Sequence, residues 1–379
     1  NRIVVLTELG LGELDRWSLA GRTAESHYQR VLSLLGGSAG KSSREAEQSL
    51  LDSWRVEALI GLGASIADPA EQDRRLARAD ETLQLLASAD PDNLRLLRLS
   101  GEVGLFRGNT AGNLNGTWLG AQLAGKAYEA SQHLVQHDRD NLQWKLVAAR
   151  TLRIVGNLAR QRQRWADAHK AFETGDKFAG DLVKAEPSWR LARYTHATLL
   201  WERGETNLVY EQTLKGKDAS HVIALNTILP LIELSKTEYE VGIRRAPGDG
   251  EFVRALTLAI GDLADAHLAH ADYDDVIQLS TQAIKALAPI ERGAKTDENV
   301  LSNKRYYLEL LGRAWEGKKN WKEATDAYAS LVDIAGQLAS RTRLPSDETS
   351  LAGALVDLAN AWWSSGDRVK AAAQYDRAS

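Results

Sequence analysis

Large and small residues alternate at helical spacing in two stretches near the C-terminus, residues 311–331 and 358–378. In each stretch, two apolar segments flank a short polar turn, and apolar residues recur every three or four positions, as in amphipathic helices. Small residues let two antiparallel helices approach closely, and aromatic residues fill the space beside that contact. Each stretch therefore predicts a hairpin of two helices. The matched positions are Gly312 and Ala359, Trp315 and Trp362, Ala324 and Ala371, and Tyr328 and Tyr375.

Weaker copies of this pattern precede the two clear ones. Residues 155–172 and 260–283 keep the same frame, and residues 188–203 predict another first helix that ends at a turn. After a break at residues 216–220, we expect a helix from about Ala219 to Arg245 that is kinked by Pro230. This segment is interpreted as one repeat with an enlarged second half.

Three polar joints support a repeating architecture independently. Asp90-Pro91-Asp92-Asn93, Asp138-Arg139-Asp140-Asn141 and Glu186-Pro187-Ser188-Trp189 each follow one apolar segment and precede another, at intervals of 48 residues. Each joint is predicted to end one helix and begin the next.

The N-terminal third has a less regular pattern. Residues 9–35 and 43–66 are amphipathic and predict helices, with Ser43 as a candidate N-cap. Residues 70–88 predict a helix that opens at Pro69.

A glycine- and asparagine-rich segment, Gly108–Gly116, lies between helices predicted at residues 94–107 and 118–137. It predicts a loose loop, which is either a simple insertion or part of a binding edge. Because no segment alternates with a period of two, the protein is expected to be essentially all helix.

The spacing of glycine, alanine, tryptophan and tyrosine in these hairpins resembles that of tetratricopeptide repeat (TPR) proteins. The resemblance implies an all-α solenoid, a right-handed superhelix of about six to seven helical hairpins, some with elongated helices. Residues 1–89 are then divergent repeats or a cap, and residues 90–379 are the array. Its expected repeats are approximately 90–140, 141–187, 188–250, 251–297, 298–349 and a truncated 350–379.

The long period and the joint before Trp144 resemble, more narrowly, the arrays of large bacterial signalling proteins. That resemblance implies a sensory or scaffolding segment of a larger polypeptide, in a cytoplasmic or periplasmic domain. The sequence does not choose between these compartments.

Composition narrows the range of partners. The net charge is −4 and acids and bases are interspersed, so nucleic acid is not an expected partner. No apolar run reaches the roughly 20 residues of a membrane-spanning helix, and we expect a soluble chain without membrane insertion. The chain has no cysteine, which excludes disulfides and thiolate chemistry. No catalytic constellation, cofactor turn or metal site can be assembled with any specificity, so we expect neither an enzyme nor a cofactor.

A basic strip is predicted on the first helix of the repeat that begins at Asn141. Its members recur at intervals of three or four residues, and the TPR resemblance implies that this face lines the concave groove. Arginine forms paired hydrogen bonds with carboxylates, so the strip suits an acidic ligand or a C-terminal carboxylate. The alternative is a solvated face that is paired with acids of a neighbouring repeat. The candidate partner-binding residues are Arg150, Arg153, Asn157, Arg160, Tyr194, Trp201, Arg313 and Asn360.

Two other motifs favour structural explanations over chemistry. His133 and His137 lie one helical turn apart, as two metal ligands on a helix would, but no third ligand is apparent nearby. Their place in the last turn of a helix, where a positive charge complements the helix dipole, is a sufficient structural explanation. His267 and His270 likewise lack a further metal ligand. The loop Gly36–Ser43 ends in Gly-Lys-Ser but lacks the glycine spacing and the preceding strand of a phosphate loop.

Three functional hypotheses follow. The first is a non-catalytic module that binds a protein or peptide on its concave face. The second is a structural scaffold that self-associates. The third, kept only as a contrast, is an enzyme that binds a nucleotide at residues 36–43.

Overall fold

The computed structural model describes residues 2–17, 21–36, 45–66, 68–114, 116–215, 228–247, 249–291 and 298–379. Every regular element within these ranges is an α-helix, which confirms the all-α prediction. In chain order they are α1 (Arg2–Trp17), α2 (Gly21–Gly36), α3 (Glu45–Ala64), α4 (Pro69–Ala89), α5 (Leu94–Asn113), α6 (Thr117–His137), α7 (Leu142–Gln161), α8 (Trp165–Ala185), α9 (Arg190–Lys215), α11 (Leu229–Arg245), α12 (Gly250–Ala269), α13 (Tyr273–Glu291), α14 (Glu298–Gly317), α15 (Trp321–Thr342), α16 (Pro345–Ser365) and α17 (Arg368–Ala378).

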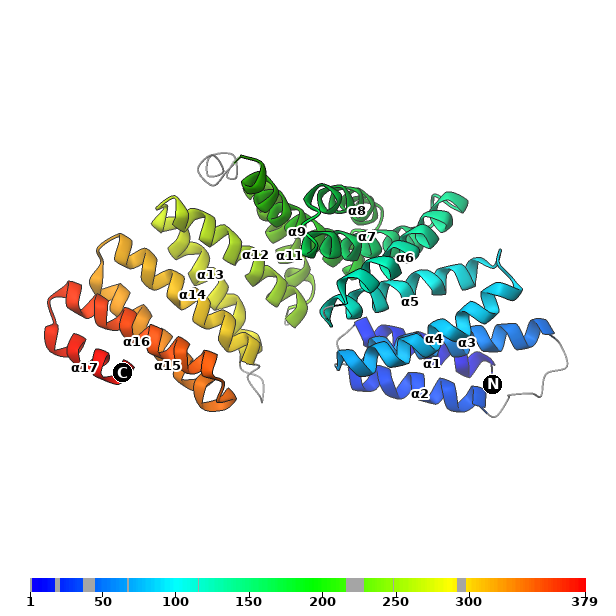
Figure 1. The fold of residues 1–379 in the computed structure, drawn as a ribbon, viewed down its shortest axis with the longest axis horizontal. Helices are drawn as coiled ribbons and strands as arrows, with labels where there is room; N and C mark the ends of the chain where they lie inside the picture. The colour runs from blue at the N-terminus through cyan, green and yellow to red at the C-terminus, as the bar shows by residue number, and fades with distance from the viewer. Residues whose placement is uncertain are drawn as a thin grey trace. The chain divides into compact units, whose positions relative to one another are not determined.

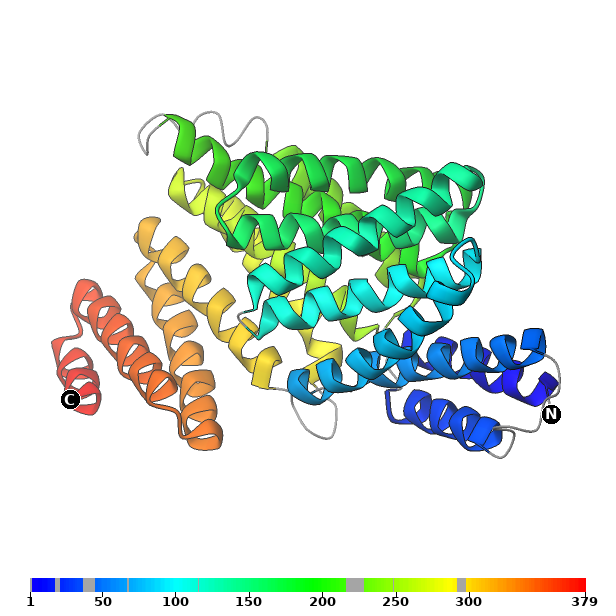
Figure 2. The same ribbon diagram turned by 45° about the vertical axis from the view of Figure 1, so that its right-hand side comes forward.

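The chain divides into two compact units, Asn1–Leu214 and Lys215–Ser379. Within each unit, successive helices pack side by side as hairpins (Figures 1 and 2), for example α5 on α6 in the first unit and α14 on α15 in the second. The first helices of consecutive hairpins also touch, as α3 does α5 and α5 does α7. This stacking of helical hairpins is the predicted TPR-like architecture. The predicted separation of residues 1–89 from 90–379 stays a prediction.

The polar joints begin and end helices as predicted. Helices α4, α6 and α8 end at Ala89, His137 and Ala185, and the next helices begin five residues later in each case. Asn93 and Asn141 cap α5 and α7 by accepting hydrogen bonds from backbone amides of the first turn.

A fourth joint of the same kind was not recognised in the sequence. Helix α11 ends at Arg245, α12 begins at Gly250, and the side chain of Asp249 accepts from the amides of Glu251 and Phe252. Its Ala-Pro-Gly-Asp sequence preserves only the proline and the polar cap.

The turns inside four hairpins share one backbone geometry. A residue with positive φ closes each first helix: Gln163 at 57°, Ala271 at 60°, Lys319 at 58° and Gly366 at 93°. Each donates its amide to the carbonyl three residues back, and the next residue donates to the carbonyl five residues back, as the Asn320 amide does to Trp315 at 2.9 Å. These are Schellman motifs, in which backbone groups satisfy the last carbonyls of the helix.

The predicted pairing of small and aromatic residues is present in the core. A Cβ atom at Gly312 would lie 2.4 Å from Cε1 of Tyr328, and one at Gly156 would lie 2.5 Å from Cε1 of Phe172. Both aromatic rings are fully buried. The glycines therefore provide the space that each ring occupies between the two helices of its hairpin.

The prediction of a loose loop at Gly108–Gly116 is wrong. Helix α5 continues to Asn113, and its glycines face α6. A Cβ at Gly108 would lie 3.2 Å from the carbonyl oxygen of Gly120, and one at Gly104 would lie 2.9 Å from Cβ of Ala127. The glycines are spaced by four residues because two helix backbones meet there.

Other element predictions are corrected. Residues 9–35 contain parts of two helices, α1 and α2, instead of one. Pro230 lies in the first turn of α11, where proline fits without kinking a helix interior. The predicted N-cap Ser43 and residues 216–220 lie outside the described residues.

Candidate functional site on the first helices of the N-terminal unit

The predicted basic strip on α7 is paired with acids of the next first helix, α9. Arg153 Nη1 donates to Glu202 Oε1 at 3.0 Å, and Asn157 Nδ2 donates to the same oxygen at 2.8 Å. Arg160 forms an ion pair with Glu205. The structure therefore places most of the strip in bonds between neighbouring repeats, the alternative that the sequence left open.

Glu202 is the most buried acid of this network, with 4% of its side chain exposed. Burial raises its pKa, although Arg153, Asn157 and Arg160 act in the opposite direction. The second carboxylate oxygen, Oε2, is buried and has no hydrogen-bond partner among the described residues, and the same holds for Oδ1 of Asn157. An ionised carboxylate oxygen and an amide oxygen can only accept hydrogen bonds, and neither of these two atoms receives one from the described residues. The hydrogen-bond network around Glu202 is therefore incompletely satisfied.

A second group of charges lies on the preceding first helices, α3 and α5. Glu57 of α3 accepts from Arg95 at 2.5 Å and from Arg98 at 2.8 Å, and Arg98 also donates to Glu102 at 2.6 Å. Burial disfavours the charged form of Arg98, but Glu102 and Glu57 outweigh it and raise its pKa. Between the two groups, the guanidinium of Arg150 lies 5.6 Å from the centre of the Phe106 ring.

A cavity of about 540 Å³ opens beside this second group. Its polar wall is Glu57, Arg95 and Arg98, and its apolar wall comes from α1, α5 and Trp144 at the start of α7. Leu6, on the apolar wall, is 51% exposed. The volume lies in the usual range for ligand pockets, roughly 300–1,000 Å³. The lining residues are Leu6, Leu9, Gly10, Tyr28, Glu57, Leu94, Arg95, Arg98 and Trp144.

This cavity was not predicted from the sequence. The charge pattern on α7 pointed to Arg150 and the residues after it, whereas the cavity uses Trp144, one to two turns earlier on the same helix. The joint Asn141-Leu-Gln-Trp144 was the available signal, because it places an aromatic side chain in the first turn of a first helix.

The remaining predicted residues lie apart from the cavity lining. Tyr194 and Trp201 are partly buried on α9. Arg313 and Asn360 are exposed in the second unit, where Asn360 Oδ1 accepts from the hydroxyl of Tyr375 at 2.6 Å. Their role as partner contacts stays a prediction.

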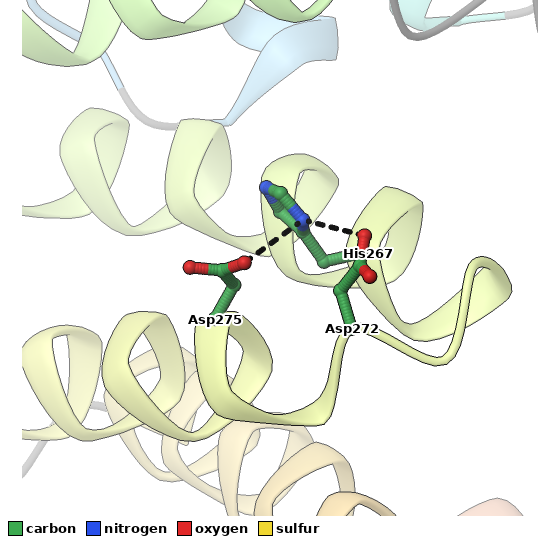
Figure 3. Close-up of side chains that lie close together, drawn as sticks. All are labelled: His267, Asp272 and Asp275. Carbon is green, nitrogen blue, oxygen red and sulfur yellow. Dashed lines mark hydrogen bonds and ion pairs between the residues drawn. The ribbon is translucent and has the colours of Figure 1, made fainter.

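One cluster in the second unit has donor atoms suited to a metal ion (Figure 3). His267 Nδ1 at the end of α12 lies 3.5 Å from Asp272 Oδ2 and 3.7 Å from Asp275 Oδ2. The two carboxylates are exposed and lie at the start of α13, where the helix dipole favours negative charge. The arrangement is accounted for without an ion.

The loop that resembles a phosphate loop follows helix α2, which ends at Gly36. A phosphate loop follows a strand, and this requirement is not met. Residues 37–44 lie outside the described residues.

Comparison with known proteins identifies the fold. No family model matches the chain, and no curated protein matches it. The crystal structure of the apo form of RapI is similar over 99% of this chain and 96% of that one, with a TM-score of 0.56 and 10% identity. The apo quorum sensor NprR from B. thuringiensis matches over 99% and 97%, with a TM-score of 0.46 and 10% identity. A tetratricopeptide repeat protein from Parabacteroides merdae matches over 93% and 99%, with a TM-score of 0.34 and 12% identity.

The chain has the fold of a TPR-like helical repeat protein, as the sequence predicted. At 10% identity, the similarity to RapI concerns the fold alone. Among the helices that the structure describes, none has the length and apolar character needed to cross a bilayer.

Proposed function

We propose that this chain is a binding module for a protein or peptide and that the ligand occupies the cavity on the first helices of the N-terminal unit. The observation that carries the proposal is the cavity itself, which joins an apolar wall to two arginines. Helical repeats leave such surfaces open because each hairpin packs mainly on its neighbours. The role is binding without catalysis.

The composition of the cavity indicates the chemistry of the ligand. Tryptophan and arginine are the residues that most often dominate binding energy at protein interfaces, and Trp144 and Arg95 face the same space. Arg95 and Arg98 share Glu57, and Arg98 also pairs with Glu102, so the charges of this group balance and the two guanidinium groups act on a ligand as hydrogen-bond donors. An apolar side chain next to a carboxylate would contact both walls, and a free C-terminus provides that combination.

The test uses short peptides that end in leucine or phenylalanine, each made with a free carboxylate and with a C-terminal amide. Binding is measured by fluorescence anisotropy with the full chain. We expect the free carboxylates to bind more tightly than the amides, and Trp144→Ala and Leu6→Glu each to weaken binding about tenfold or more. Arg377→Ala, an exposed arginine of α17 in the second unit, is the matched control and should bind as the parent does.

Equal binding of acids and amides would contradict the proposed polar contact. Unchanged binding by Trp144→Ala and Leu6→Glu would contradict the cavity as the site. Circular dichroism of each variant shows whether the helices are retained, so that a loss of binding is not confused with unfolding.

The resemblance noted in the sequence leads us to propose further that the module belongs to a larger bacterial signalling protein, with a protein instead of a nucleic acid as its partner. The sequence of the complete gene product decides the first point. Retention of the chain on immobilised DNA or RNA at physiological salt would contradict the second.

A self-associating scaffold remains the second candidate because of exposed apolar side chains on the last hairpin. Trp363 is 55% exposed and Val369 is 82% exposed, and Arg368 covers one face of the Trp363 ring at 5.1 Å. A molecular mass by light scattering that rises with concentration, and does not rise in Trp363→Ala, would support the scaffold.

A further inference from the structure

A second groove, further along α7, shares no residue with the cavity described above. It lies between α6 and α8, the second helices of two consecutive hairpins, and α7 forms its floor. The floor is apolar and consists of Leu152, Val155 and Ala159. The groove encloses about 480 Å³.

The walls of the groove keep it wide. Ala121 of α6 and Ala171 of α8 line it with methyl groups, and Tyr128 and Thr174 add polar atoms. Helix α6 packs on α7, and α8 packs on α7 from its other side. Of the floor residues, Val155 is partly exposed, whereas Leu152 and Ala159 are buried beneath the surface of the groove.

An exposed tryptophan stands at one end of the groove. Trp118, in the first turn of α6, lines the groove and is 68% exposed. The neighbouring Leu114 and Leu119 are exposed at 46% and 43%. A large apolar side chain left in water next to an apolar groove is the usual arrangement of an interaction site.

The rim of the groove is basic. Arg162, Arg164 and Lys170 line it together with a single acid, Asp167. Arg164 is occupied by Asp167, with Nη2 at 2.6 Å from Oδ2. Within the described residues, Arg162 and Lys170 form no ion pair, and both side chains are exposed. Two unpaired positive charges therefore lie beside an apolar floor.

We propose that this groove binds an acidic amphipathic helix of a partner protein. The apolar stripe of such a helix would rest on Ala121, Val155 and Trp118, and its flanking carboxylates would meet Arg162 and Lys170. A helix laid in a groove between helices is a common mode of peptide recognition, and it uses anchors spaced by three or four residues. The complementary charge selects an acidic helix over a basic one.

The probe is a fluorescein-labelled helical peptide of about 18 residues, roughly 27 Å long, with leucine at every third or fourth position and glutamate on the flanks. Two matched peptides carry lysine in place of glutamate, or two prolines in the middle. Anisotropy with the full chain should show binding of the acidic helical peptide and at least about tenfold weaker binding of the other two. Binding should weaken as salt is raised.

Trp118→Ala should weaken binding of the acidic peptide about tenfold or more. Arg162→Glu combined with Lys170→Glu should weaken it further, and salt should no longer weaken binding to this variant, because the rim then repels the peptide. The matched controls are Trp363→Ala, which removes another exposed tryptophan, and Lys177→Glu, which reverses an exposed charge of α8. Both controls should bind as the parent does.

Equal binding of the acidic and basic peptides, equal binding of the proline peptide, or unchanged binding by Trp118→Ala would each overturn the proposal. A chain that dimerises in solution and becomes monomeric in Trp118→Ala would also overturn it, because a second copy would then fill the groove. The result does not depend on the first cavity, because Trp144→Ala leaves every residue of this groove in place.

Discussion

Gly312→Ala tests the packing rule on which the hairpins depend. In an exposed helical position, replacing glycine by alanine stabilises a helix by about 0.5–1 kcal/mol. At Gly312, however, the added Cβ would lie 2.4 Å from Cε1 of Tyr328 and 2.7 Å from Cδ1 and Cζ. The ring would have to move by about 1 Å to restore ordinary contact.

The Tyr328 ring has little freedom to move. It is 1% exposed, and its hydroxyl donates to Glu316 Oε2 at 3.0 Å. Overpacking of a closed core costs about 1–3 kcal/mol. Because this exceeds the gain in helix propensity, Gly312→Ala should lower the free energy of unfolding by about 1–2 kcal/mol.

Gly353→Ala is the matched control in the same unit. Gly353 lies within α16, and a Cβ there would meet no atom within 4 Å. This substitution should raise the free energy of unfolding by about 0.5–1 kcal/mol, so the two variants should have opposite signs. Urea unfolding followed by circular dichroism measures both.

The double variant Gly312→Ala with Tyr328→Leu separates the clash from other effects. The clash with the ring is absent in this background, so the alanine should cost less there than in the parent. A Gly312→Ala variant as stable as the parent would refute the reasoning, and so would equal effects of the alanine with and without the ring.

Three further predictions concern the buried acid, one hairpin turn and one joint. Burial raises the pKa of Glu202 in the folded state above its ordinary value of 4.5. The folded state therefore binds a proton at Glu202 more tightly than the unfolded state does. This contribution to stability is complete below pH 4.5 and is lost as the pH rises through the folded-state pKa. The stability of Glu202→Gln relative to the parent should therefore increase with pH across this window in urea titrations, and a constant difference would contradict it. Lys319→Gly should raise the melting temperature, by relieving about 1 kcal/mol of positive-φ strain, and an unchanged melting temperature would count against strain there. Asn141→Ala should lower the free energy of unfolding by about 1 kcal/mol, because the Trp144 amide loses its side-chain acceptor; an equally stable variant would show that water replaces the cap.

The sequence predicted those elements that depend on local chemistry. The joints at Asn93 and Asn141 are capped by the side chains that the sequence displays, so helix ends could be located to within a residue or two. Gly108 was misread because a glycine-rich segment is typical both of a loop and of a close contact between helices. Only the position of α6 distinguishes these two cases.

The candidate sites could not be predicted from the sequence because they depend on contacts between residues that are far apart in the chain. Arg153 meets Glu202, 49 residues later in the chain, and Arg98 meets Glu57, 41 residues earlier. A strip of arginines on one helix does not reveal which acids of the next repeat neutralise it. The cavity beside Trp144 likewise requires α1, which is remote from α7 in the chain.

The four Schellman turns have a consequence for the evolution of this chain. Gln163, Ala271 and Lys319 share no side-chain property, yet their amides and those of the following residues close the same two backbone hydrogen bonds as Gly366 does. Because backbone hydrogen bonds hold the geometry of these turns, mutation can change the residue types there without altering the angle between the two helices that each turn joins. Hairpins that arose by duplication can in this way lose their sequence similarity while they keep the same fold.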